Sequence, residues 1–145
     1  MAKAEQLARD PLQRDNWVLT PHPGEAARLL GCSTDKIEQD RFAAVRQLQH
    51  RLGGVVILKG AGTLICDDQG IYVANVGNPG MASGGMGDVL SGIIGGLLAQ
   101  GLNLSQAAML AVCIHGLAAD LAAEDDERGL LAADLFPYIR KLVNP

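Results

Sequence analysis

Residues 77–96 read G-N-P-G-M-A-S-G-G-M-G-D-V-L-S-G-I-I-G-G. The first part of this stretch is a loop, because Pro79 donates no amide hydrogen bond and closely spaced glycines permit backbone angles that other residues avoid. From Asp88 the pattern changes: apolar residues recur at helical spacing as far as Leu98, and Gly101 is placed to end a helix. The sequence therefore predicts a glycine-rich loop that runs directly into a buried helix.

A loop that feeds a helix in this way can bind phosphate. The first amides of a helix have no partner inside the helix, and the positive end of its dipole favours an anion. We expect an anion hole made by the amides of Gly85, Met86, Gly87 and Asp88. An acid at a helix start is more often a cap or a favourable first-turn charge. The density of glycine around Asp88 favours a binding site, because a cap needs none of these glycines.

Composition limits the class of protein. With 145 residues the chain fits one domain, residues 1–145, and abundant glycine with few aromatic residues favours an α/β protein. The net charge of −4 without a basic run argues against a nucleic-acid partner. Three cysteines with no C-x-x-C pair are typical of reduced thiols, and we expect a cytoplasmic protein without a signal peptide. The apolar run 107–123 contains His115 and Asp120, which favours a buried helix over a membrane span.

Short apolar runs predict the strands of the sheet. Residues 55–58 are the clearest, because a continuous aliphatic run is expected of a strand that is covered on both faces. Residues 17–19 form another candidate. Residues 64–66 and 71–76 flank a polar turn at 67–70 and are predicted to form a β-hairpin.

The helices are predicted from capping residues and periodicity. Ser33 or Thr34 is expected to cap one long amphipathic helix that ends at Gly53, and four of its polar residues are expected to face water: Arg41, Arg46, Gln49 and His50. We expect a short helix over 25–30 and a long helix capped by Ser105. The remaining segments are a mildly helical 1–8, a solvated acidic turn at 125–127 and a helical region over 130–142 around Pro137.

Three polar loops follow apolar strands: one around His22, one around Lys59 and one around Asp88. In open α/β sheets, ligands bind at the carboxyl ends of the strands, so the three loops can converge there. Each loop alone is a weak signal. Residues 20–25 also fit a plain turn, and residues 59–62 also fit the start of a hairpin.

Three motifs together resemble a known family. They are T-P-H-P-G-E at 20–25, K-G-A-G-T at 59–63 and N-P-G-M-A-S-G-G-M-G-D-V-L-S-G at 78–92. In this order they resemble the ADP-dependent NAD(P)H-hydrate dehydratases of the YjeF C-terminal type, and the similarity extends from about residue 17 to residue 145. The resemblance implies a ribokinase-like three-layer α/β/α fold, with a mostly parallel sheet plus a β-hairpin.

The same resemblance implies a lyase that repairs hydrated NADH and NADPH. An adenine nucleotide, ADP or ATP, would phosphorylate the hydroxyl of the hydrate, and elimination of phosphate would restore the dihydronicotinamide. His22 and Asp88 would contact the hydrated substrate, with Asp88 as general base. A set of loop residues would bind the adenine nucleotide: Lys59, Gly60, Ala61, Gly62, Thr63 and Gly87. Mg²⁺ is expected on the phosphates, with no protein side chain assigned as a metal ligand.

The family's catalytic domain is considerably longer than this chain. We therefore expect the C-terminal portion of a ribokinase-like domain, truncated on its N-terminal side as an expressed fragment, a truncated gene product or a relic, with impaired turnover. A sheet cut through its middle exposes a strand edge and an apolar face, so we expect a homo-oligomer. We expect no membrane partner, because the apolar run 107–123 fits a buried helix. Two alternatives stay open: a ribokinase-like kinase of a small hydroxymethyl substrate, and a non-catalytic nucleotide-binding module.

Overall fold

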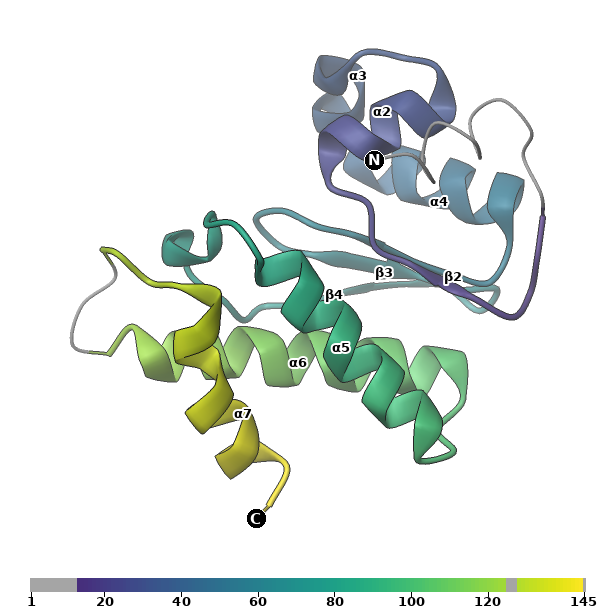
Figure 1. Ribbon diagram of the computed structural model, residues 1–145. Coiled ribbons are helices and arrows are strands. Elements are labelled where there is room, and N and C mark those ends of the chain that lie inside the picture. The colour runs from purple at the N-terminus through teal and green to yellow at the C-terminus, as the bar shows by residue number, and fades with distance from the viewer. Residues whose placement is uncertain (1–12, 125–127, 145) are drawn as a thin grey trace. The chain divides into compact units, whose positions relative to one another are not determined.

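The computed structural model describes residues 13–124 and 128–144 (Figure 1). The chain divides into two compact units, residues 1–74 and 75–145, and each has a hydrophobic cluster of its own. The single domain that the chain length predicts stays a prediction. The helical segment predicted at 1–8 and the acidic turn predicted at 125–127 lie outside the described residues.

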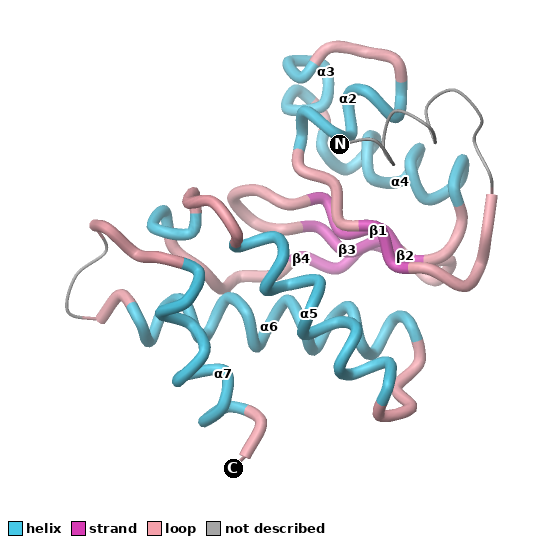
Figure 2. The backbone as a smooth tube through the Cα atoms, viewed as in Figure 1, coloured by secondary structure: helices cyan, strands magenta, loops and turns pink. Residues whose placement is uncertain are grey.

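The first unit contains a sheet of four strands in the order β1-β2-β3-β4, drawn in magenta in Figure 2. The strands are β1 (Val18–Leu19), β2 (Val55–Leu58), β3 (Leu64–Cys66) and β4 (Ile71–Val73). The predicted strands and hairpin are confirmed, although β4 ends at Val73 rather than at residue 76. β1 pairs with β2 in parallel, whereas β2–β3 and β3–β4 are antiparallel. The described strands therefore form a small mixed sheet, in which β1 and β2 are parallel and the predicted hairpin adds two antiparallel pairings.

Three helices accompany this sheet: α2 (Pro23–Leu30), α3 (Thr34–Gln39) and α4 (Arg41–Leu52). α4 packs against β2 and β3. Apolar residues at helical spacing on α4, among them Val45, Leu48 and Leu52, are buried in one cluster with Val56 and Leu58 of β2. This is the inner face that the periodicity predicts.

The prediction of one long helix from residue 33 or 34 to residue 53 is wrong. Ser33 caps α3, as expected, through the amide of Lys36. The helix then breaks at Asp40, whose φ of −147° and ψ of 82° are not helical. The Asp40 carboxylate accepts a hydrogen bond from the amide of Ala43 at 2.9 Å and so begins α4. An aspartate that can cap a new helix inside an apparently continuous pattern is the physical reason for the break.

The second unit is helical in its described residues. It contains the 3₁₀ turns η1 (Pro79–Met81) and η2 (Ala132–Leu135), and the helices α5 (Met86–Ala99), α6 (Leu104–Ala122) and α7 (Phe136–Leu142). α5 and α6 pack against each other, and α7 packs against α6 (Figure 1). Met86, Ala118 and Leu135 lie in the buried cluster that joins these elements. The helical region predicted around Pro137 is confirmed.

α6 begins two residues earlier than predicted. Asn103, not Ser105, is its N-cap, since the Asn103 side chain accepts from the amide of Gln106 at 2.9 Å and the Gln106 side chain accepts from the amide of Asn103 at 3.3 Å. α6 is also the one described helix that is long and apolar enough to cross a membrane. Half of its most apolar stretch of 18 residues is buried inside the structure. The core helix of a soluble protein can have the same length and composition.

Candidate functional site

His22 opens α2 and is held by a reciprocal cap. Its Nδ1 accepts from the amides of Gly24 at 3.1 Å and Glu25 at 3.3 Å, while the Glu25 carboxylate accepts from the amide of His22 at 2.8 Å. Pro23, at the start of the helix, has no amide hydrogen that needs a partner. The motif at 20–25 is therefore a helix start rather than the extended loop that its two prolines suggest.

The cap fixes how His22 can act on a ligand. Since Nδ1 is an acceptor, the neutral ring carries its proton on Nε2. The side chain is 50% exposed, and Nε2 lies 3.7 Å from the Glu25 carboxylate. His22 therefore presents an oriented N–H donor at the surface of the first unit, which suits an oxygen atom of a substrate.

The loop 59–63 follows β2 and carries the predicted nucleotide-binding residues. Gly60 has a φ of 141°, a left-handed value that favours glycine. The Thr63 hydroxyl donates to the carbonyl of Gly60 at 3.2 Å, and the Thr63 carbonyl accepts from the amide of Ala74 at 2.9 Å. None of the amides from Gly60 to Thr63 donates a hydrogen bond to a described residue. This loop therefore offers a run of open donors beside the ammonium of Lys59.

The loop 59–63 and the His22 cap lie at one edge of the sheet. β1 and β2 are parallel, so their carboxyl ends meet there. The amide of Lys59 donates to the carbonyl of Pro21 at 2.9 Å, which joins the two loops directly. The expected convergence of these two loops is confirmed. The third loop, around Asp88, belongs to the other unit, so its place beside them stays a prediction.

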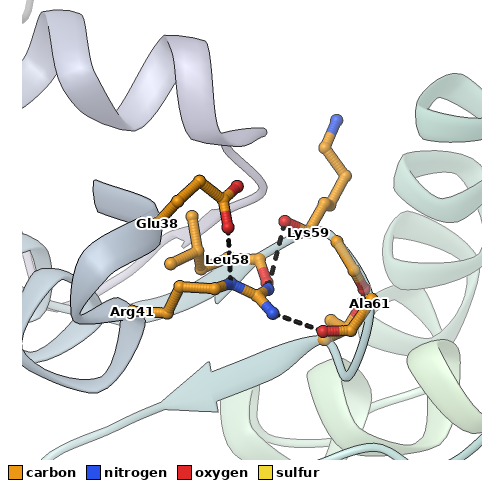
Figure 3. Close-up of polar contacts among 7 residues, drawn as sticks. Glu38, Arg41, Leu58, Lys59 and Ala61 are labelled. Atoms are coloured by element: carbon orange, nitrogen blue, oxygen red, sulfur yellow. Dashed lines mark hydrogen bonds and ion pairs between the residues drawn. The ribbon is translucent and has the colours of Figure 1, made fainter. Parts of the chain in front are cut away.

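Arg41 holds the loop 59–63 from the side of α4 (Figure 3). Its guanidinium donates to the carbonyls of Leu58 and Lys59, each at 3.3 Å, and to the carbonyl of Ala61. The prediction that Arg41 faces water is wrong, because its side chain is only 17% exposed. Figure 3 shows the Lys59 side chain pointing away from this guanidinium, and no described residue pairs with its ammonium.

In the second unit, a carboxylate holds the start of the glycine-rich loop. Asp120, in the last turns of α6, accepts from the amide of Gly77 at 2.9 Å and from the side-chain amide of Asn78 at 3.1 Å. Asn78 in turn caps η1, since its side-chain oxygen accepts from the amide of Gly80 at 3.0 Å. In the sequence, Asp120 is only a charged residue within the apolar run 107–123, so this contact was not predicted.

The helix α5 starts at Gly85, as the glycine-rich pattern predicts. Gly85 is the N-cap with a φ of 88°, and no side chain caps the helix there. Asp88 is an exposed first-turn residue, and no described residue hydrogen-bonds to its carboxylate or pairs with it. The Asp88 side chain therefore does not cap the helix, which is the role that an acid at a helix start more often has.

The predicted anion hole has three open amides rather than four. The amide of Asp88 donates to the carbonyl of Gly85 at 3.0 Å, so it is already used. The amides of Gly85, Met86 and Gly87 donate to no described residue. These three amides lie at the N-terminus of a helix of 14 residues. The positive end of the helix dipole favours an anion there.

The family resemblance implies Mg²⁺ on the phosphates of the nucleotide, with no protein side chain as a metal ligand. No group of three or more His, Cys, Asp or Glu side chains among the described residues can hold a metal ion. Mg²⁺ commonly keeps most of its ligands from phosphates and water, so a magnesium nucleotide fits these loops without a cage of carboxylates.

Away from these loops, the buried thiol of Cys66 lies at the end of β3, directly before the hairpin turn. Burial raises the pKa of this thiol; nearby Arg46 lowers it and Asp67 raises it further. A small hollow lies beside Cys66, lined by residues of α4 and of the turn at 67–70. Cys113, on α6 of the other unit, is exposed.

A sequence profile of NAD(P)H-hydrate dehydratases matches residues 1–141. The chain belongs to the NAD(P)H-hydrate dehydratase family. Among curated members, it is 62% identical over 141 residues to the bifunctional NAD(P)H-hydrate repair enzyme of Coxiella burnetii. The match covers 96% of this chain and 29% of the Coxiella protein, so the chain spans less than a third of that relative.

Solved structures agree with the family. The ADP/ATP-dependent NAD(P)H-hydrate dehydratase of Bacillus subtilis, co-crystallised with ATP and Mg²⁺, matches with a TM-score of 0.82 and 32% identity, over 87% of this chain and 46% of that one. A ribokinase-like superfamily protein of Enterococcus faecalis matches with a TM-score of 0.81 and 31% identity, over 99% of this chain and 52% of that one. The ribokinase-like α/β fold that the resemblance implies is thereby confirmed.

Proposed function

We propose that this chain carries the nucleotide-binding loop and the general base of an ADP-dependent NAD(P)H-hydrate dehydratase, a lyase of nicotinamide nucleotide repair. The observation that carries the proposal is the start of α5. There the Asp88 carboxylate is exposed and unused by any cap, beside three open amides. The family match and the Bacillus dehydratase crystallised with ATP and Mg²⁺ support this interpretation.

The first unit binds the adenine nucleotide in this proposal. The Lys59 ammonium and the open amides from Gly60 to Thr63 contact its phosphates. Gly87 is assigned to nucleotide binding as the family resemblance implies. Such donors are fixed in place before the ligand arrives, so little reorganisation is needed when negative charge develops. When bound, the magnesium nucleotide supplies the phosphoryl group that is transferred to the hydroxyl of hydrated NADH or NADPH.

Two residues are proposed to contact the hydrate, His22 and Asp88. His22 donates its Nε2 proton in a hydrogen bond that orients the substrate. Asp88 accepts the proton of the substrate hydroxyl as that oxygen attacks. The amides of Gly85, Met86 and Gly87 stabilise the charge of the transferred phosphoryl group, which is the main demand of phosphoryl transfer. Elimination of phosphate from the phosphorylated hydrate then restores the dihydronicotinamide.

A turnover assay tests this proposal. A full-length family member that carries this segment is incubated with hydrated NADH, Mg²⁺ and ADP or ATP, and both the dihydronicotinamide absorbance and the released phosphate are followed. The dehydratase produces both signals together. A kinase of another substrate produces neither signal. Calorimetry that detects nucleotide binding without any turnover indicates a non-catalytic module instead, and both results contradict the proposal.

We also propose that the chain is cytoplasmic and self-associates. Its three cysteines are free, as in a reducing compartment. Several large apolar side chains of the second unit are exposed, among them Leu110 and Leu117 of α6 at 43% and 41%. Exposed apolar patches mark interfaces, so a homo-oligomer is expected. Light scattering measures this directly, and a stable, well-folded monomer contradicts the self-association.

A further inference from the structure

Arg41 occupies an unfavourable place for a cation. It is the first residue of α4, where the positive end of the helix dipole opposes a positive side chain, and no acidic residue lies in that first turn. Its side chain is also mostly buried, at 17% exposure. Burial of a charge is costly unless hydrogen bonds compensate for it. Something else must therefore hold the guanidinium there.

The compensation comes from the loop that follows β2. One terminal nitrogen, Nη2, donates to the carbonyls of Leu58 and Lys59, each at 3.3 Å, and Nη1 donates to the carbonyl of Ala61 (Figure 3). Nε lies 4.0 Å from the Glu38 carboxylate, which is 52% exposed. A planar guanidinium has its donors in a fixed fork, so it can hold several carbonyls at once.

Gly60 makes this contact possible. A Cβ at this position would lie 2.9 Å from Nη2 of Arg41. The guanidinium therefore sits directly against the backbone of the loop. The helix break at Asp40 places Arg41 at the end of α4 that meets this loop.

The contacts of Arg41 divide the loop into two sides. The carbonyls of residues 58, 59 and 61 are taken by the guanidinium, and the carbonyl of Gly60 is taken by the Thr63 hydroxyl. The amides from Gly60 to Thr63 donate to no described residue. Carbonyl oxygens repel phosphate, whereas backbone amides bind it. Because the guanidinium binds the carbonyls, the loop presents its backbone amides as free hydrogen-bond donors on the other side.

We infer that Arg41 is a positioning residue for nucleotide binding, which acts by fixing the carbonyls of the loop 58–61 and so presenting the amides of 60–63 to the phosphates. The inference rests on the proposed nucleotide site at this loop. Arg41 itself does not need to touch the nucleotide. It sets the conformation in which the loop can bind one.

Three variants of α4 separate this role from a general effect of charge. Arg41→Ala removes the anchor, and Arg46→Ala removes the same charge from an exposed position on the same helix. Arg41→Lys keeps the charge but loses the fork. Two properties are measured for each protein at a temperature where it is fully folded: the ¹⁵N backbone order parameters of residues 59–63 without ligand, and the Kd for Mg-ADP by calorimetry.

We expect both Arg41 variants to lower the loop order parameters from about 0.85 to below about 0.6. Loss of hydrogen bonds from a charged donor should weaken Mg-ADP binding by about tenfold or more in the same two variants. Arg46→Ala should leave both properties unchanged. If Arg41→Ala does not fold, Arg41→Lys gives the same test, because it removes the fork and keeps the charge.

The outcomes are distinct. A rigid loop in Arg41→Ala overturns the inference, and so does a normal Kd in Arg41→Lys, which would show that charge alone matters. If the unchanged chain binds no Mg-ADP, the proposed nucleotide site fails, and the loop order parameters alone then decide whether Arg41 positions the loop.

Discussion

The two glycine-rich loops are anchored by opposite charges. The loop 59–63 is held by a cation, Arg41, which binds its carbonyls. The start of the loop 77–85 is held by an anion, Asp120, which binds the amide of Gly77 and the side chain of Asn78. The choice of anchor decides what each loop can still bind, because an anchored group is no longer available to a ligand.

The difference explains where the open donors lie. In the first loop the amides themselves, from Gly60 to Thr63, stay open. In the second loop the amides from Gly77 to Ala82 are mostly used within the loop or by Asp120, and the open donors lie further on, at Gly85–Gly87 where α5 begins. The first loop can thus bind phosphate through its own amides, whereas the second loop positions the start of α5 and its residue Asp88.

The largest effect is expected for Asp88→Asn in a full-length family member that carries this segment. Asparagine keeps the shape of the side chain but cannot accept a proton, so turnover should fall by about 10²–10⁴. Nucleotide affinity should stay nearly unchanged, since the open amides are backbone groups. Steady-state kinetics and calorimetry measure the two effects. Near-parental turnover in this variant would reduce Asp88 to a first-turn charge.

The anchor of the second loop is broken by Asp120→Ala. The amide of Gly77 then loses a charged acceptor, so its hydrogen exchange should accelerate by about tenfold or more. Glu124→Ala is the matched control, because it removes the same charge from an exposed position beyond the end of α6. Equal exchange rates of Gly77 in the two variants would show that Asp120 anchors nothing.

The start of α5 is tested by Gly85→Ala. Gly85 has a φ of 88°, and a Cβ there would lie 3.2 Å from the Cβ of Ala132. The strained backbone should lower the free energy of unfolding by about 1–2 kcal/mol. Gly84→Ala is the neighbouring control, since a Cβ at Gly84 meets nothing within 4 Å. Urea denaturation compares the two, and an equal loss in both would argue against the left-handed cap.

The smallest effect concerns the thiols of the two units. Because burial raises the pKa of Cys66, the folded state keeps this proton at a pH where the unfolded thiol has lost it. The contribution of Cys66 to the free energy of unfolding is therefore fully present below pH 9.0, the ordinary pKa of a thiol. This contribution declines as the pH rises above 9.0. Cys66→Ala should show a shallower decline of stability in that range. A thiol reagent should modify exposed Cys113 well before Cys66, and the reverse order would contradict the burial.

Much of this arrangement is local and could be predicted. The strand at 55–58, the hairpin turn at 67–70 and the glycine start of α5 all follow from neighbouring residues. The N-cap of α6 was predictable as well, since Asn103 and Gln106 have the spacing of a capping box. The prediction instead chose Ser105, which is also a favourable N-cap residue.

Arg41 and Asp120 could not be predicted, because their partners are distant in sequence. In the continuous helical pattern that the sequence predicts from residue 33 or 34 to residue 53, Arg41 is one more polar residue of the outer face. Its role depends on carbonyls 17 to 20 residues away. Asp120 likewise binds residues 42 and 43 positions earlier. Periodicity reports which face is apolar, but it does not report which backbone groups a buried charge will meet.

The most direct test of the account is a titration of the ¹⁵N-labelled chain with Mg-ADP, followed by its backbone amide signals. The account predicts that the amides of Gly60–Thr63 and those of Gly85–Gly87 shift as Mg-ADP is added, while those of Gly77 and Gly80, which are already hydrogen-bonded, shift little. Shifts confined to other residues, such as the hairpin turn at 67–70, would contradict the central claim that these two sets of open amides bind the nucleotide.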